Sequence, residues 1–552
     1  MAVLLALLIS AFLVVGASFA ANDSSVWFTS SVGAAIGSAL AGIVIAAGLY
    51  LPIRILYALL DRRWDRRPEP AAGVIPMRTA LRRWFLPTFG AVSAGWLCWL
   101  LIHYPGSVDS DTITQLFQWL GLAAKVDHHP WFDTMIFGWF FDIGRAVGDL
   151  NVGLFVFLLF QVIATAAGMA LALSYLARLG LPRGPRRVLT AFVAVFPTFA
   201  MSVSVMSKDS FAGIFWIPFL VLYVEALRTR GRVLCRPWVG AAAVALAIPL
   251  VLAKRSNVYL VVLCIVVLLL VSAWRTGLRL GIGAAVIVLV TNVLWPAAVL
   301  PALHVRPGTL NDTLSIPLQQ TARTVALHGN EIPPAERAAI DAVLRYDGLA
   351  KAYVPRRSDA VKGRWDNGAT PAQKGAYWRT WLAQLTRYPS TYLAATANNS
   401  YEYFAPSSTL NFQTDLNLRR YVDFWQSRSL EGTTREQIEQ VALSLHPPAA
   451  LAPATVAVNR ANRAFITGNL LASKALYCSW IPLFALGFAF RRRSWLLALA
   501  TVPLFLNLAV LVAGPIALPR YMGPLILGSV LIVGLLLIPV RAQGRSLPPE
   551  DG

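Results

Sequence analysis

The sequence predicts an α-helical membrane protein whose chain crosses the bilayer many times. Of the 552 residues, 57% are hydrophobic and only 14% are charged, whereas about 25% are charged in soluble domains. Apolar runs of about 20 residues recur along the chain, and each is long enough to cross a hydrocarbon core as a helix. A helix also satisfies its own backbone hydrogen bonds there, which lipid cannot do.

About twelve such runs are expected to span the membrane. The first, residues 1–20, ends in Ala-Ser-Phe-Ala and has no basic residue ahead of it, so a cleaved signal peptide and a retained helix fit it equally well. The other runs lie at about 32–56, 82–103, 151–178, 187–206, 210–227, 237–253, 257–273, 280–301, 469–490, 494–513 and 519–540.

Arg-rich gaps between these runs predict the orientation. The net charge is +21, and gaps such as "DRRWDRRPEP" and "FRRRSW" follow every second run. The positive-inside tendency places such gaps in the cytoplasm. Basic residues in short gaps, rather than along one helix face, argue for contact with membrane lipids and against nucleic-acid binding. We expect a multi-pass protein of a bacterial inner (plasma) membrane, with its working face on the periplasmic or extracytoplasmic side.

The gaps divide the chain into three expected parts. Residues 1–301 form an N-terminal transmembrane module, whose first outer loop, residues 104–150, is unusually polar. Residues 302–468 are long enough for a mainly helical extracytoplasmic domain, in which the Pro- and Ala-rich stretch 446–457 resembles an extended linker. Residues 469–552 supply the last membrane helices and a short cytoplasmic tail.

The first outer loop, "HYPGSVDSDTITQLFQWLGLAAKVDHHPW", holds the strongest functional signal. Apolar residues recur on one face of residues 109–122, which predicts an interfacial helix lying on the bilayer. Asp109 and Asp111 stand at its start, where carboxylates are favoured by unpaired amides. Capping explains one of these acids and leaves the other unexplained. Residues 131–147 predict a second interfacial helix rather than a spanning one.

Carboxylates followed by histidines favour two kinds of site. One is general-base chemistry, in which an acid takes the proton of an attacking hydroxyl. The other is a divalent metal, Mg or Mn, held by Asp109, Asp111, His128 and His129. The metal signature is weak, because the spacing is irregular and adjacent histidines point in different directions.

Cations gather on the same predicted face. Lys208, Lys254, Arg255 and Arg520 each lie at a helix end, where a cation in a membrane protein usually has an anionic partner. Snorkelling of each side chain to the headgroups is the alternative. Cations suit a phosphate, which Arg binds through two hydrogen bonds and Lys as a point charge.

These features together resemble the GT-C superfamily of polytopic glycosyltransferases, which take a sugar from a polyprenyl-phosphate carrier outside the membrane. The helix count and the stretches "YPGSVDSDTITQ", "HHPW", "SKDS", "SIPLQQTARTV" and "LPRYMGPL" carry the resemblance. The sequence departs from better-known branches in lacking a Glu-Ala pair after the acid, so the resemblance leaves the sugar and the acceptor open.

The resemblance implies a role for each candidate residue. Asp111 would deprotonate the acceptor hydroxyl, with Asp109 as its substitute or a metal ligand. Substrate binding would fall to side chains in the same stretches and cationic helix ends: Gln115, His128, His129, Lys208, Arg255, Gln319, Gln320, Arg520 and Tyr521. The implied partners are a polyprenyl-phosphate-linked sugar donor and a glycan, lipid or protein acceptor. A divalent metal, Mg or Mn, is the one cofactor left open.

Two rival functions use similar features. A transporter or lipid-linked-glycan flippase also has about twelve helices, but usually carries ionisable residues near the bilayer midplane and a duplicated half. A polysaccharide polymerase or ligase would use an outer loop and cations in much the same way, and the sequence separates it from the transferase only weakly.

Overall fold

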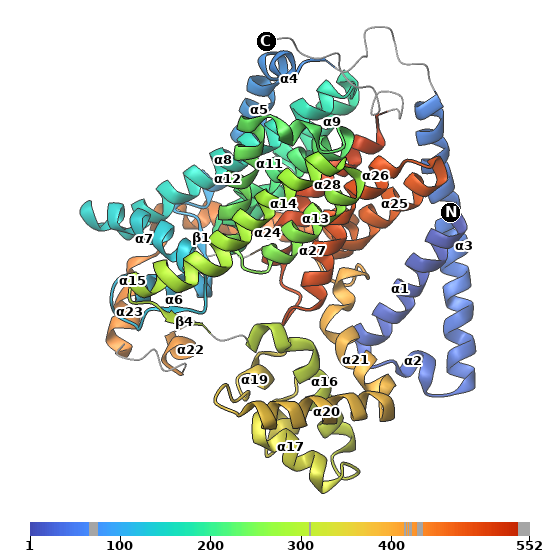
Figure 1. The fold of residues 1–552 in the computed structure, drawn as a ribbon, viewed down its shortest axis with the longest axis vertical. Coiled ribbons are helices and arrows are strands. Elements are labelled where there is room, and N and C mark those ends of the chain that lie inside the picture. Colours follow the sequence, from blue (N-terminus) through green and yellow to red (C-terminus); the bar gives the residue numbers. More distant parts are fainter. Residues whose placement is uncertain are drawn as a thin grey trace.

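The computed structural model describes residues 1–65, 75–308, 311–412, 414, 416, 418, 422–427 and 434–538. A bundle of helices fills most of the molecule, and a smaller helical domain lies beyond one end of it (Figure 1). Within the described residues, eight helices are long and apolar enough to cross a membrane, or up to ten if each of two bent pairs is one span. The protein is therefore a helical membrane protein, with fewer such helices than the twelve expected. The expected cytoplasmic tail begins at the edge of the described residues, and 539–552 lie outside them.

The eight candidate spans follow the predicted apolar runs. They are α1 (Ala2–Asn22), α3 (Val32–Asp65), α4 to α5 (Met77–Ile102), α8 (Leu150–Arg178), α11 (Lys208–Arg228), α14 to α15 (Trp274–Ala302), α26 to α27 (Trp495–Val512) and η10 to α28 (Pro519–Leu536). The shorter apolar helices are α12 (Pro237–Ala253) and α13 (Asn257–Val271), and the last run before α26 is divided between η9 (Leu476–Trp480) and α25 (Ile481–Arg492).

The run predicted at 187–206 is bent. It forms α9 (Arg183–Val195) and α10 (Pro197–Val203), which meet at 56°. Pro197 lacks a backbone N–H, and its ring disfavours helical geometry at the preceding residue, so the helix ends there. Hydropathy records the apolar run but not the bend, which explains part of the shortfall from twelve spans.

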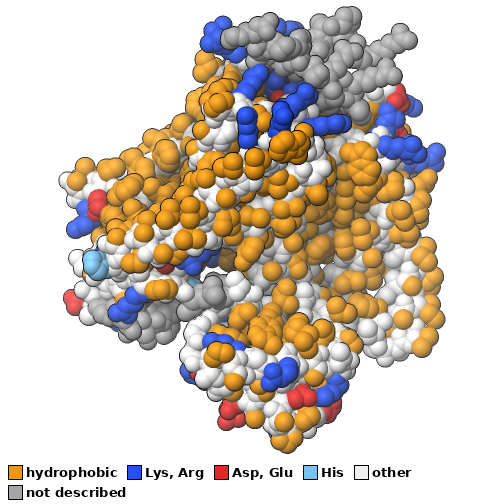
Figure 2. Space-filling view, in the orientation of Figure 1, with side chains coloured by type: hydrophobic (Ala, Val, Ile, Leu, Met, Phe, Trp, Pro, Cys, Tyr) orange, Lys and Arg blue, Asp and Glu red, His pale blue; other side chains and the backbone are white. Residues whose placement is uncertain are grey.

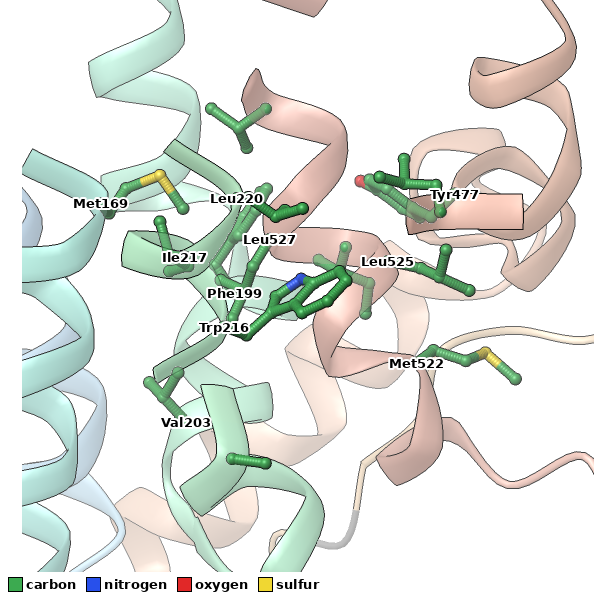
Figure 3. Close-up of a cluster of buried hydrophobic side chains, with 14 of the residues drawn as sticks. Met169, Phe199, Val203, Trp216, Ile217, Leu220, Tyr477, Met522, Leu525 and Leu527 are labelled. Atoms are coloured by element: carbon green, nitrogen blue, oxygen red, sulfur yellow. The ribbon is translucent and has the colours of Figure 1, made fainter. Parts of the chain in front are cut away.

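Helices α11 and α28 form the centre of the bundle. In each, 78% of the apolar window is buried inside the protein. Trp216 of α11 donates from Nε1 to the carbonyl oxygen of Pro524 at 2.7 Å, and Figure 3 shows its ring beside Leu525 and Leu527 of α28. This packing fixes the start of α28, and with it the residues just before that helix.

The outer helices present apolar side chains around the bundle. Only 6% of the window in α3 and 11% of that in α14 to α15 are buried. Figure 2 shows a broad hydrophobic band over the bundle and Lys and Arg side chains gathered at the end opposite the smaller domain. A band of this size is a liability in water and suits lipid. We call the two ends the basic end and the domain end.

Two pairs of very short strands join loops at the domain end. Strand β1 (Ser107–Val108) pairs in parallel with β3 (Val205–Met206), and β2 (Val126–Asp127) with β4 (Arg306–Pro307). The pairs bring the first outer loop against the start of α11 and against the chain entering the smaller domain. The sequence predicted neither pair, because strands of two residues carry no periodicity.

The smaller domain has a core of its own, with residues between Leu318 and Tyr377. Its helices are α16 (Ser315–His328), α17 (Pro334–Leu344), α18 (Leu349–Ala352), α19 (Asp359–Lys362), α20 (Pro371–Arg387) and α21 (Pro389–Ser400). The later helices α22 (Val422–Ser427), α23 (Arg435–Ser444) and α24 (Ala452–Ile466) return to the bundle, and Leu445 belongs to the bundle core.

Helix α24 corrects one expectation. The stretch 446–457 is not an extended linker, because α24 begins at Ala452. Pro453 lies at the first turn, where its missing N–H would have no partner in the helix anyway. Thr455 of α24 donates to the carbonyl oxygen of Ile102 at 2.8 Å, which ties the returning chain to the end of α5.

The first outer loop forms both predicted helices, α6 (Ser110–Trp119) and α7 (Trp131–Ala146). An interfacial helix would expose the face opposite its apolar side, but Thr112 and Gln115 on that face of α6 are both only 1% exposed. Thr112 donates to the carbonyl oxygen of Met206 at 2.9 Å, and Gln115 donates to Thr134 Oγ1 of α7 at 2.9 Å. Helix α6 is therefore covered on both faces.

Candidate functional site

A polar cavity of about 560 Å³ lies between the domain end of the bundle and the smaller domain. Its walls come from the starts of α6 and α11, the segment before α28, and the region around α19. Seven of the residues selected from the sequence line it: Asp109, Asp111, His128, His129, Lys208, Arg520 and Tyr521. The cavity is the only place in the described structure where so many of the predicted site residues meet.

The pairing of β1 with β3 positions the first of these residues. Val108 lies opposite Met206, and Asp109 N donates to the carbonyl oxygen of Met206 at 3.2 Å. Helices α6 and α11 begin directly beyond the two strands, so Asp109 and Lys208 come to lie at neighbouring helix starts. Helix starts carry unpaired N–H groups and partial positive charge, which favours carboxylates and other anions there.

Arg520 holds both carboxylates of the first outer loop. Its Nη1 forms an ion pair with Asp109 Oδ2, and its Nη2 donates to Asp111 Oδ2 at 2.9 Å. Nη2 also donates to the Tyr521 hydroxyl at 3.1 Å. The planar guanidinium thereby fixes two acids with one side chain, a geometry that Lys cannot reproduce.

Lys208 and His129 complete the surroundings of Asp111. Lys208 Nζ lies 3.5 Å from Asp111 Oδ2 and 3.2 Å from His129 Nδ1. Burial lowers the pKa of His129 to about 3, so the ring is neutral at neutral pH and its Nδ1 accepts from the ammonium. The 3.9 Å approach of His129 Nδ1 to Asp111 is therefore not an ion pair.

The two carboxylates differ in their acidity. Burial raises the pKa of Asp109, and Arg520 only partly offsets that effect. Burial acts in the same direction on Asp111, but Arg520 and Lys208 together hold the pKa of this carboxyl well below its usual range. Acid–base sites often contain two carboxyl groups whose pKa values are shifted in opposite directions. Of the two carboxyl groups here, Asp111 is the one that stays firmly ionised.

A second ion pair lies behind the first. Lys254 Nζ bonds Asp209 Oδ1 at 2.6 Å and lies 5.3 Å from the centre of the Tyr521 ring. Tyr521 also faces Arg520, with 5.0 Å from Cζ to the ring centre. The sequence placed Lys254 on the correct face but gave no reason to choose it over Arg255.

Four predicted substrate-binding residues do not line the cavity. Arg255 pairs instead with Asp127, donating from Nη2 to its carbonyl oxygen at 2.5 Å and to its carboxylate, and Gln115 is buried between α6 and α7. Gln319 donates to the carbonyl oxygens of Val354 and Arg357. Gln320 bonds within the smaller domain, accepting from Trp381 Nε1 at 3.1 Å.

Arg255→Gln is expected to lower the free energy of unfolding by about 1–3 kcal/mol, the usual cost of leaving a buried hydrogen-bonding group without its partner. Burial raises the pKa of Asp127 and Arg255 opposes that effect, so the variant leaves a buried acid without its cation. Thermal unfolding in detergent measures the loss, with the exposed Arg275→Gln as control. An unchanged transition would mean that this pair contributes nothing to folding.

The smaller domain adds residues that the sequence did not single out. Arg357, Asp359 and Lys362 line the part of the cavity wall that the smaller domain forms. Asp359 bonds Arg357 Nε at 2.7 Å and Lys362 Nζ at 3.0 Å. Their spacing in the sequence resembles any exposed polar loop, so only the docking of the domain gives them a place in the site.

The proposed metal ligands do not fit a metal in this arrangement. Among the described residues, no three His, Cys, Asp or Glu side chains are grouped so that they could hold one ion. Asp109 and Asp111 are both bonded by Arg520, and His129 faces Lys208. A divalent ion would have to displace both cations, so we assign it no part in the site.

Asp133 is buried near the cavity with no hydrogen-bond partner for either carboxylate oxygen among the described residues. Burial raises its pKa well above the usual 3.8. A raised folded-state pKa contributes stability below the unfolded value, and this contribution is lost as the pH rises through the folded value.

Asp133→Asn is therefore expected to change little at about pH 4 and to stabilise the protein relative to wild type at neutral pH. Thermal unfolding of both proteins across this range measures the difference. Parallel pH dependences of the two proteins would show that Asp133 does not titrate with folding.

One family model matches most of the chain, over residues 123–546. The match includes His128, His129, Lys208 and Arg520, and it begins beyond Asp109 and Asp111. No curated protein and no solved structure matches significantly. Because the matched region covers well over half of the sequence, the protein belongs to the family of unknown function DUF6020.

Proposed function

We propose that the protein is a membrane glycosyltransferase of the GT-C type that moves a sugar from a polyprenyl-phosphate donor to a glycan, lipid or protein acceptor. The observation that carries this proposal is the cavity itself. It places a firmly ionised carboxylate beside two cations, Lys208 and Arg520, at the end of a membrane bundle. A base for an acceptor and cations for a phosphate are the two requirements of this reaction.

The chemistry assigns a separate task to each side. Asp111 takes the proton of the acceptor hydroxyl, and the acceptor oxygen forms a bond to the anomeric carbon. The bond from that carbon to the phosphate oxygen breaks, and the phosphate leaves with the electron pair. Lys208 and Arg520 stabilise the charge that develops on it. Direct displacement inverts the anomeric centre.

The ion pairs of the site also suggest how the base is activated. In the free protein Arg520 and Lys208 neutralise Asp111, and a carboxylate held this way is a weak base. A donor phosphate competes for the same two cations, because phosphate is an equally good partner for them. As they turn to the phosphate, the pKa of Asp111 rises, so the donor prepares the base for the acceptor.

The orientation of the proposed site follows from charge. The basic end of the bundle resembles cytoplasmic loops, and this supports an orientation with the cavity on the outer face of a bacterial inner membrane. A polyprenyl donor held in the outer leaflet would present its phosphate at this level. The smaller domain then covers the cavity from the extracytoplasmic side.

Transfer of labelled sugar tests the proposal. Purified protein in lipid nanodiscs would be incubated with a panel of polyprenyl-phosphate sugars and an envelope extract as acceptor, with release of free polyprenyl phosphate as a second readout. Label appearing in an acceptor supports the proposal. If no donor is consumed while the protein moves lipid-linked sugar across sealed vesicles, the protein is a flippase instead.

A further inference from the structure

The wall of the cavity formed by the smaller domain, which we call the roof, carries its own cations. Arg357 and Lys362 lie on either side of Asp359, which bonds both. Arg357 uses Nε for this bond, and its side chain is 50% exposed. Within the described part of the chain, its terminal nitrogens Nη1 and Nη2 form no hydrogen bond, so this end of the guanidinium remains accessible to an anion.

The roof is fixed to the segment that carries Arg520. Ser358 donates from its backbone N to the carbonyl oxygen of Pro515 at 3.0 Å, and Asn399 Nδ2 donates to that of Gly514 at 2.6 Å. Within the smaller domain, Gln319 Nε2 donates to the carbonyl oxygen of Arg357. Arg357 is therefore held in the cavity wall by contacts with the segment that carries Arg520, rather than on a loosely attached loop.

Charge is distributed unequally between the two sides. On the bundle side, Lys208 and Arg520 face two carboxylates, Asp109 and Asp111. Among the roof side chains that line the cavity, two are cationic, Arg357 and Lys362, and one is a carboxylate, Asp359. Burial is more than offset by Lys362 and Arg357, so the pKa of Asp359 is lowered. Among the described lining residues, the surplus positive charge thus lies in the roof.

We propose that Arg357 and Lys362 form a phosphoryl-binding subsite in the roof of the cavity. Lys208 and Arg520 line the same cavity, so a phosphoryl group held there meets cations of both the smaller domain and the bundle. The phosphoryl group belongs to the donor carrier or to an anionic acceptor, and this assignment rests on the proposed function. The affinity of the subsite for phosphate is independent of the proposed function.

Binding to protein in nanodiscs tests the subsite with two probes, polyprenyl phosphate and the soluble monoester glycerol 3-phosphate. The variants are Arg357→Gln and Lys362→Gln. Lys351→Gln is the matched control, because Lys351 is an exposed lysine of the same domain outside the cavity lining. Each roof variant is expected to weaken binding about tenfold, the usual effect of one charge-assisted hydrogen bond, and the control is expected to change nothing.

The pattern of loss identifies the source of the phosphoryl group. Weaker binding of the lipid probe alone assigns the subsite to the donor, and weaker binding of the soluble probe alone assigns it to the acceptor. Arg357→Lys, which keeps the charge, should recover part of the affinity and so separates a binding role from misfolding. Unchanged affinity for both probes in both variants would overturn the subsite. Because no sugar transfer is measured, failure of the proposed reaction would leave this result intact.

Discussion

Asp111→Asn is expected to reduce sugar transfer by a factor of about 10² to 10⁴, the usual contribution of a general base. The amide keeps the shape of the side chain and can still accept a hydrogen bond from Arg520, but it cannot take a proton. The measurement is the transfer rate at saturating donor and acceptor, with protein abundance and thermal unfolding compared for each variant. The acidic limb of the pH profile should disappear together with the rate.

Two further variants make this result specific. Asp109→Asn should cause a smaller loss, because the Asp109 side chain is less open to the cavity, 12% against 26% for Asp111. Asp142→Asn is the control, since Asp142 belongs to the same outer loop but bonds Trp119 and Arg145 away from the cavity. Full activity of Asp111→Asn would remove Asp111 from the chemistry, and loss in Asp109→Asn alone would exchange the two roles.

Arg520→Gln is expected to destabilise the protein as well as to abolish transfer. Arg520 is the counter-charge of both Asp109 and Asp111, and removing one partner of a buried ion pair costs about 3–5 kcal/mol. Two neighbouring carboxylates would then repel each other in a partly closed cavity. Thermal unfolding in detergent should show a clear drop, and donor binding should weaken in the same variant.

The double variant Arg520→Gln/Asp109→Asn separates the two effects. Removing one carboxylate relieves the repulsion, so stability should recover in part while transfer stays absent. Arg520→Lys should keep most of the stability but raise the KM for the donor, because an ammonium cannot hold two acids and a phosphate in one plane. Equal stability of Arg520→Gln and wild type would show that the ion pairs are structurally neutral.

Much of the site could be predicted because helix ends are visible in hydropathy. Asp109, Asp111, Lys208 and Arg520 each stand where an apolar run or an amphipathic helix begins, and charge is rare in such a chain. The glutamines illustrate the opposite case. Gln115 and Gln319 carry no local sign of burial, yet each bonds a neighbouring segment and supports the cavity without lining it.

Hydrophobic periodicity does not show where an apolar run bends or which cation reaches the cavity. The number of candidate spans and the set of cations that line the cavity therefore could not be predicted from it. Pro197 bends one apolar run by 56°. The pairing of β2 with β4 sets Asp127 beside Pro307, and Asp127 forms an ion pair with Arg255. The roof cations lie in a domain that is docked by contacts between distant segments, among them the hydrogen bond from Ser358 to Pro515. No local pattern encodes such a contact.

The sequence by itself determined that this is a helical membrane protein with acids and cations concentrated at one end of its helices. Hydropathy and charge are properties of neighbouring residues, so they can be read along the chain. Only the tertiary structure decided that Arg520 joins two carboxylates from the first part of the chain, of which Asp111 lies 409 positions away. It also decided that Arg357, which belongs to a separate domain, lines the same cavity. These contacts depend on how distant segments pack, and the free energy that selects them comes from the whole bundle.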